Sequence, residues 1–154
     1  MQYRFAPVML AVNHIQQRTS GECLAACSAM ALNYLGYRAD YQHLINLLRI
    51  RPFIGTPFFN IRKLSKLGVK VTYKQGTLAE IHQCLTNNYP CIVAVQTEQL
   101  PYWNYTNSHH VIVAIGINSE FIYVNDPEFA DAPIAVNLGD FDLAWLEQES
   151  ITPC

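Results

Sequence analysis

The periodicity of the chain changes about half-way along, and this change constrains the fold more than any other feature of the sequence. From Gly21, the run GECLAACSAMALNYLG is rich in Ala and Leu, places apolar residues on one helical stripe and stops at Gly36, a favoured C-terminal residue of helices. Segments 90–95 and 110–115 are instead short runs of small and β-branched residues, which are typical of buried strands. Helices followed by strands predict an α+β fold.

The other segments agree with this order. Further helices are predicted over 40–49 with Asp40 as the cap, over 60–67, from Thr77 to about 85, and over 141–147. Further strands are predicted over 69–73, 121–124 and 134–136, with 110–115 and 121–124 forming a hairpin across a Gly/Asn turn. The chain has 154 residues, half of them apolar, so we expect one compact domain over 1–154.

Charge and hydropathy narrow the classes of partner. The formal net charge is −2 and no Lys/Arg-rich run occurs, so the footprint of a nucleic-acid-binding protein is missing. The N-terminal segment lacks the basic region of a signal peptide, and no apolar stretch reaches the roughly 20 residues that cross a bilayer. We therefore predict a cytoplasmic protein with no nucleic-acid partner and no stable membrane insertion.

The five cysteines give an odd count and form no CxxC pair; they lie at 23, 27, 84, 91 and 154. This pattern argues against a disulfide framework and against a zinc knuckle, so we predict reduced thiols and no bound metal.

Cys23 is a candidate nucleophile because it lies in the first turn of the helix that follows Gly21. A thiol attacks as its thiolate, which a helix N-terminus and a nearby imidazolium both favour. Cys27, one turn further along, lies deeper in the apolar run and is predicted to be a core residue. The alternative for Cys23 is the same, since most free cysteines are small buried hydrophobes.

Two histidines, His109 and His110, open the predicted strand HHVIVAIG. If the hairpin loop is the three residues 117–119, His110 faces Asp126 across the sheet, and the carboxylate can orient the imidazole. A shift of register places Asp126 opposite His109 instead. The loop therefore decides which histidine serves as the base, because neighbours on a strand face opposite ways.

Attack on a carbonyl also creates an oxyanion, which needs preorganised donors. The side-chain amide of Gln17 and the backbone N–H of Cys23 are candidates. The alternative for Gln17, or for its neighbour Gln16, is an exposed loop residue.

In the order Gln, Cys, His, Asp, these pieces resemble papain-like cysteine peptidases, and among them the C39-type peptidases, which process double-glycine leader peptides in bacterial peptide exporters, and their free-standing relatives. The matching pieces are QRTSGECLAAC, AMALNYLG, HVIVAIG and YVNDP, and the resemblance covers about residues 16–146. It implies Cys23 as nucleophile, His110 as general base and acid, Asp126 as its orienter and Gln17 as oxyanion donor. His109 then becomes a flanking residue near the pocket rim.

The resemblance also implies a papain-like fold, in which N-terminal helices, with the nucleophile at a helix start, pack on a C-terminal antiparallel sheet. It implies a hydrolase that cleaves a peptide or amide bond through an acyl-enzyme, without a cofactor, on a peptide or protein substrate and in association with a peptide-export or maturation system. The alternatives are an acyltransferase or deamidase using the same site, or a non-catalytic domain that binds leader peptides.

Two features depart from the pattern or stay open. Leu24 follows the nucleophile where the family usually has glycine, so a side chain is expected where a substrate backbone passes. The aromatic residues Tyr102, Trp103 and Tyr105 either line a substrate groove or pin a loop to the core.

Overall fold

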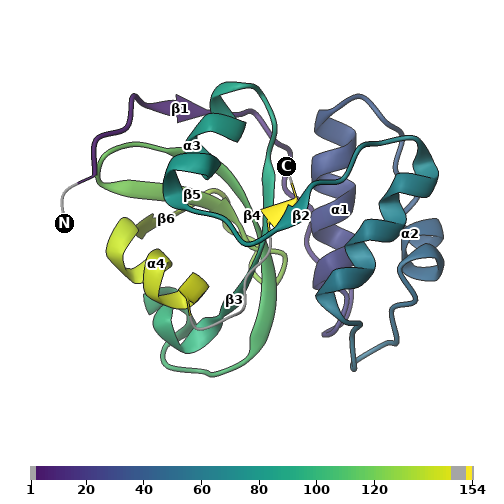
Figure 1. Cartoon of the computed structure of the whole chain (residues 1–154). Helices are drawn as coiled ribbons and strands as arrows, with labels where there is room; N and C mark the ends of the chain where they lie inside the picture. The colour runs from purple at the N-terminus through teal and green to yellow at the C-terminus, as the bar shows by residue number, and fades with distance from the viewer. Residues whose placement is uncertain (1–2, 147–151, 154) are drawn as a thin grey trace.

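The computed structural model describes residues 3–146 and 152–153. Helix α1 (Cys23–Tyr34) is buried at every position from Leu24 to Leu32, as expected of a helix that is apolar on all sides. The helix ends just before Gly36, which has a φ of 92°. It packs against strand β4 (His109–Ile117) and against helix α2 (Tyr41–Leu47), as Figure 1 shows. The predicted central helix is confirmed.

The predicted caps are also confirmed. The Asp40 carboxylate accepts hydrogen bonds from the backbone of Gln42 and His43 at the start of α2, and the Thr77 hydroxyl accepts one from the backbone of Glu80 at the start of α3 (Leu78–Thr86). The segment before Gly68 is a 3-10 helix, η1 (Phe58–Leu67), rather than an α-helix. The last predicted helix is α4 (Leu138–Leu146), which starts earlier than expected; position 147 lies outside the described residues.

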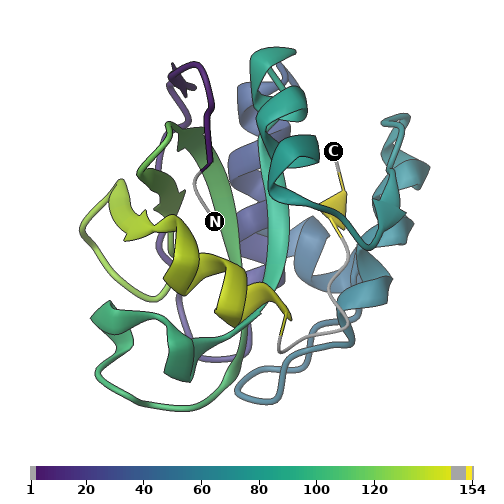
Figure 2. The same cartoon turned by 60° about the vertical axis from the view of Figure 1, so that its left-hand side comes forward.

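Strand β4 is the centre of a five-stranded antiparallel sheet. Along one edge it pairs with β3 (Cys91–Gln96) and then with β1 (Val8–Met9), and along the other with β5 (Phe121–Asn125), which pairs with β6 (Ile134–Asn137). In both views of the molecule the central strands lie between α1 and α4 (Figures 1 and 2). The structure is therefore the predicted papain-like α+β fold, with the helix that begins at Cys23 packed on an antiparallel sheet.

The strand predicted over 69–73 is largely wrong. Only Tyr73–Lys74 forms a strand, β2, which pairs with β7 (Thr152–Pro153). Val69 and Val71 nevertheless pack, partly buried, against the core. The alternation in this segment reflects side-chain burial without a strand partner. Within the described residues, no helix has both the length and the apolar character needed to span a membrane.

Candidate active site

The two cysteines of α1 have different surroundings. Cys23, the first residue of the helix, is partly buried and lines a cavity. Cys27 is fully buried, and its Sγ donates to the carbonyl oxygen of Val111 at 3.3 Å. Burial, more than the nearby negative charges, raises the pKa of Cys27 well above its usual value. The prediction that Cys27 is a core residue is confirmed, which leaves Cys23 as the thiol of α1 that faces the cavity.

The expectation that all cysteines are reduced is wrong for Cys84, which is disulfide-bonded. Its position on the short helix α3 gave no local signal of this, because the distance between two cysteines depends on the tertiary fold. Among residues 3–146 and 152–153, no group of three or more His, Cys, Asp or Glu side chains is arranged to hold a metal ion.

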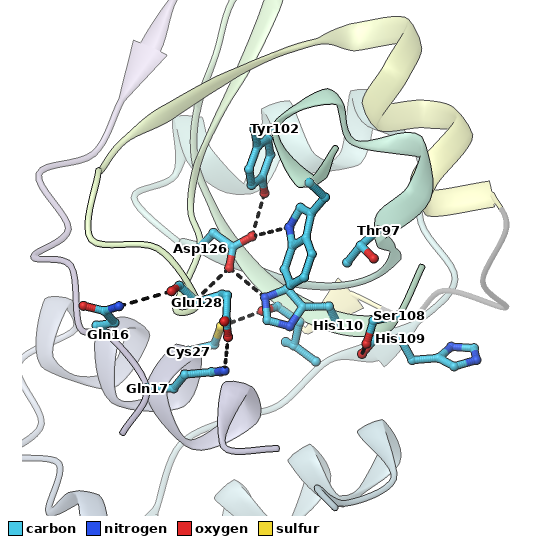
Figure 3. Close-up of polar contacts among 12 residues, drawn as sticks. Gln16, Gln17, Cys27, Thr97, Tyr102, Ser108, His109, His110, Asp126 and Glu128 are labelled. Atoms are coloured by element: carbon cyan, nitrogen blue, oxygen red, sulfur yellow. Dashed lines mark hydrogen bonds and ion pairs between the residues drawn. The ribbon is translucent and has the colours of Figure 1, made fainter. Parts of the chain in front are cut away.

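His110, the second residue of β4, contacts both Cys23 and Asp126. Its Nε2 donates to Asp126 Oδ1 at 2.7 Å, and its side chain lies close enough to Cys23 for the thiol to affect the pKa of the ring. Because Nε2 is engaged by the carboxylate, Nδ1 is the ring nitrogen left for the thiol. The ring of His109 points away from Asp126 (Figure 3), as the alternation of side chains along a strand requires. The structure therefore brings Cys23, His110 and Asp126 together in that order.

The register behind this contact differs from the predicted one. Val113 of β4 pairs with Asn125 of β5, and a bulge between Ala114 and Gly116 shifts the pairing toward the turn. His110 therefore does not lie directly opposite Asp126 in the ladder. Asp126 follows the last residue of β5 and reaches His110 diagonally, which long side chains on one face of a sheet can do.

The surroundings of His110 favour its protonated form. Burial alone would lower its pKa, because it disfavours the imidazolium. The hydrogen bond to Asp126, the interaction with Cys23 and the negative charges of these groups outweigh burial and raise the pKa of His110 to about 10. The imidazolium is thus retained at neutral pH, where it can pair with a thiolate.

Asp126 is fully buried, and four donors converge on its carboxylate (Figure 3). Oδ1 accepts from His110 Nε2 and, at 2.9 Å, from the backbone N–H of Glu128. Oδ2 accepts from the Tyr102 hydroxyl at 2.7 Å and from Trp103 Nε1 at 3.0 Å. Burial alone would raise the pKa of Asp126, but these contacts, with His110 foremost, lower it. The carboxylate is therefore held ionised and in a fixed orientation.

The aromatic stretch before the histidines thus has a role that the sequence did not reveal. Besides bonding Asp126, Trp103 packs edge-on against the His110 ring, with the ring centroids 4.9 Å apart. Tyr105, in contrast, is 91% exposed. The contacts join residues more than twenty positions apart in a segment without periodicity, so no local pattern predicts them.

Gln17 lines the same cavity as Cys23 and His110. Its backbone N–H donates to the carbonyl oxygen of Pro127 at 2.8 Å, and its side-chain Nε2 donates to Glu128 Oε2 at 2.6 Å. Cys23, as the first residue of α1, has a backbone N–H that the helix itself does not use. The two candidate oxyanion donors therefore border one cavity.

The cavity has a volume of about 600 Å³, within the range of small-ligand and peptide-side-chain sites. Its lining also includes Phe53 and Ile54, which are 72% and 74% exposed. Their turn crosses the chain just before Cys23 so closely that a Cβ on Gly21, which has a φ of 88°, would lie 2.8 Å from the backbone nitrogen of Gly55. Glycine at position 21 thus allows this apolar turn to stand beside the thiol.

The sequence predicts that Leu24 and His109 both lie beside the cavity. Leu24 also borders the cavity, but it is only 2% exposed and belongs to the core, so it obstructs the cavity less than expected. His109 is exposed and lines the cavity, in agreement with its predicted place at the rim.

One known protein family matches this chain. The sequence model of the Peptidase C39 like family matches residues 9–152. The chain belongs to this family. This assignment supports a peptidase of the cysteine type. No curated protein sequence matches the C39-like chain.

Solved structures share its fold at low sequence identity. A Bacillus anthracis protein described as a C39-like peptidase superposes with a TM-score of 0.79 at 18% identity, covering 97% of this chain and 98% of its own. A double-glycine-motif protease from an AMS/PCAT transporter, in complex with the leader peptide, gives 0.71 at 19% identity, covering 95% and 94%. The peptidase domain of Streptococcus ComA, a bi-functional ABC transporter, gives 0.70 at 18% identity, covering 92% and 96%.

Proposed function

We propose that this C39-like protein is a cysteine peptidase whose nucleophile is Cys23. The observation that carries the proposal is the position of His110, which interacts with Cys23 and donates a hydrogen bond to the buried Asp126, beside a cavity that Cys23 and Gln17 also line. A thiol at a helix start, an imidazole fixed by a carboxylate and a pair of N–H donors are the parts that acyl transfer through a thioester requires.

The proposed reaction begins from the thiolate of Cys23 and the imidazolium of His110. Sγ attacks the carbonyl carbon of the scissile bond, and the resulting oxyanion accepts hydrogen bonds from the Cys23 backbone N–H and from Gln17 Nε2. His110 gives its proton to the leaving amine as the carbon–nitrogen bond breaks, which leaves a thioester on Cys23. His110 then takes a proton from water, the hydroxide attacks the thioester, and the acid product leaves as Cys23 regains its charge.

A peptide library tests this proposal, with acid-quenched samples analysed by mass spectrometry for cleaved peptides and for an acyl adduct on Cys23. We expect cleavage and an adduct with the wild-type protein, neither with Cys23→Ala, and retention of both with Cys27→Ala, which removes the neighbouring thiol of the same helix. Absence of cleavage by wild-type protein across the library, with Cys23 unmodified, would contradict the proposal. Peptide binding without turnover would then identify a leader-binding domain.

The substrate we propose is a peptide or protein, in association with a bacterial peptide-export or maturation system. Support comes from two structures of similar fold, one described as bound to a leader peptide and one as part of an ABC transporter.

The cytoplasmic location stays a prediction. Because disulfides persist mainly in oxidising compartments, the bond at Cys84 argues against it, and thiol trapping in fresh extracts of the source cells measures which state Cys84 has.

A further inference from the structure

Glu128 is a cavity-lining carboxylate to which the proposed reaction assigns no part. It is exposed, and its side chain accepts the hydrogen bond from Gln17 Nε2. Its backbone N–H donates to Asp126 Oδ1, and its carbonyl oxygen accepts a solvent-exposed hydrogen bond from Gln16 Nε2 at 3.1 Å. Figure 3 shows Glu128 between Asp126 and the two glutamines. The residue therefore links the support of the histidine to the candidate oxyanion donor.

The Gln17 amide has two orientations that differ by exchange of its nitrogen and oxygen. A carboxylate accepts hydrogen bonds and cannot donate them, so only the orientation with Nε2 toward Glu128 forms this contact. The opposite atom, Oε1, is buried and has no hydrogen-bond partner among the described residues. A buried acceptor without a partner is costly, which favours turning the oxygen toward the open cavity. The short bond to Glu128 opposes that rotation.

We propose that Glu128 is a positioning residue, which keeps the NH₂ group of Gln17 turned toward the reacting carbonyl. One N–H of the amide is held by Glu128, and the second is free to donate to the oxyanion. A rotated amide would present its oxygen to the developing negative charge and oppose the reaction. Because the Glu128 side chain is exposed, solvent screens its own charge, while its hydrogen bond acts at short range. This inference rests on the proposed function.

The test compares kcat and KM of Glu128→Ala, Glu128→Gln and the matched control Gln16→Ala, which loses a bond to the backbone of Glu128 but leaves the Gln17 amide untouched. Loss of one oxyanion donor lowers kcat by roughly 10²–10³-fold, so an amide that is misplaced for about nine-tenths of the time should lower it by about 10-fold. We expect that loss for Glu128→Ala at nearly constant KM, a smaller loss for Glu128→Gln, whose amide oxygen can still accept, and none for Gln16→Ala. In a Gln17→Ala background, Glu128→Ala should have no further effect.

Three results would overturn the inference: an unchanged kcat for Glu128→Ala, an equal loss in the Gln17→Ala background, or faster turnover by both Glu128 variants, which would mean that the carboxylate only repels the oxyanion.

The side-chain ¹⁵N–¹H resonances of Gln17 report the position of its amide without any need for turnover. We expect one strongly shifted, hydrogen-bonded proton in the wild-type protein and its loss in Glu128→Ala. If this change occurs in a protein that cleaves no peptide, the positioning stands and the proposed function fails. Identical Gln17 resonances in both proteins would overturn the positioning.

Discussion

Tyr102→Phe tests whether the aromatic stretch supports Asp126. The substitution keeps the ring and removes one donor, the hydroxyl that lies 2.7 Å from Asp126 Oδ2. A hydrogen bond to a charged group contributes about 1.5–3 kcal/mol, and the fully buried carboxylate has no bulk solvent to replace it. We therefore expect the free energy of unfolding to fall by about 2 kcal/mol. For a chain of this size, such a loss lowers Tm by roughly 4–8 °C.

The pH dependence of this loss has a definite sign. In the folded protein the pKa of Asp126 is lowered, against the effect of burial, by His110 first and by Tyr102 among the other donors. A group with a lowered folded-state pKa contributes stability that is present above its unfolded pKa, about 3.9, and is lost as the pH falls through the folded value. The destabilisation by Tyr102→Phe should thus be full at pH 7 and shrink as Asp126 becomes protonated in strong acid.

Urea unfolding at pH 7, and at the lowest pH at which the wild-type protein stays folded, measures both effects. Tyr105→Phe is the matched control, because it removes a hydroxyl from a residue that is 91% exposed and should change nothing measurable. A loss below about 0.5 kcal/mol for Tyr102→Phe, or an equal loss for Tyr105→Phe, would refute the reasoning.

Two further predictions concern the base and the cavity wall. Asp126→Asn removes the main contact that raises the pKa of His110. The alkaline limb of the pH–rate profile, expected near pH 10 in the wild-type protein, should therefore move to lower pH, and activity should fall by about 10²-fold or more. An alkaline limb at the same pH in both proteins would contradict this prediction. Gly21→Ala should destabilise the protein by about 1–3 kcal/mol and raise KM, because a Cβ there displaces the turn that carries Phe53. The control is Gly36→Ala, because Gly36 has a similar φ of 92° but open space around it. This control should lower the thermal stability through backbone strain and leave KM unchanged.

Local patterns predicted the parts of this fold that depend on neighbours in sequence. Helix α1 follows from its unbroken apolar run, and the caps at Asp40 and Thr77 follow from side chains that bond the next turn. The strand expected at 69–73 failed, because alternation shows which side chains are buried and does not show whether a partner strand is present. The predicted hairpin register failed because the turn lies closer to β5 than expected, with Ile117 already paired with Ile122, and the bulge after Ala114 adds a further shift.

Individual residues of the candidate site could also be predicted from the sequence, whereas the contacts between them could not. Cys23 could be singled out by its position at a helix start, and His110 by its position at a strand start. The contacts that hold these residues in the site join segments that are far apart in the sequence. They are the four donors around Asp126, the hydrogen bond from Gln17 to Glu128, and the close approach of Gly21 to Gly55. Such contacts depend on how elements pack, so they could be recognised only once the fold was known.

Cys23 is proposed here as the nucleophile that His110 activates, and selective alkylation tests this role most directly. Iodoacetamide at about pH 6 leaves ordinary thiols, with a pKa of about 8.5, almost unreactive. Peptide mapping by mass spectrometry should find Cys23 labelled well ahead of every other cysteine in the wild-type protein, and His110→Ala should abolish that preference. Equal, slow labelling of Cys23 and the other cysteines, or a preference that survives His110→Ala, would contradict the claim.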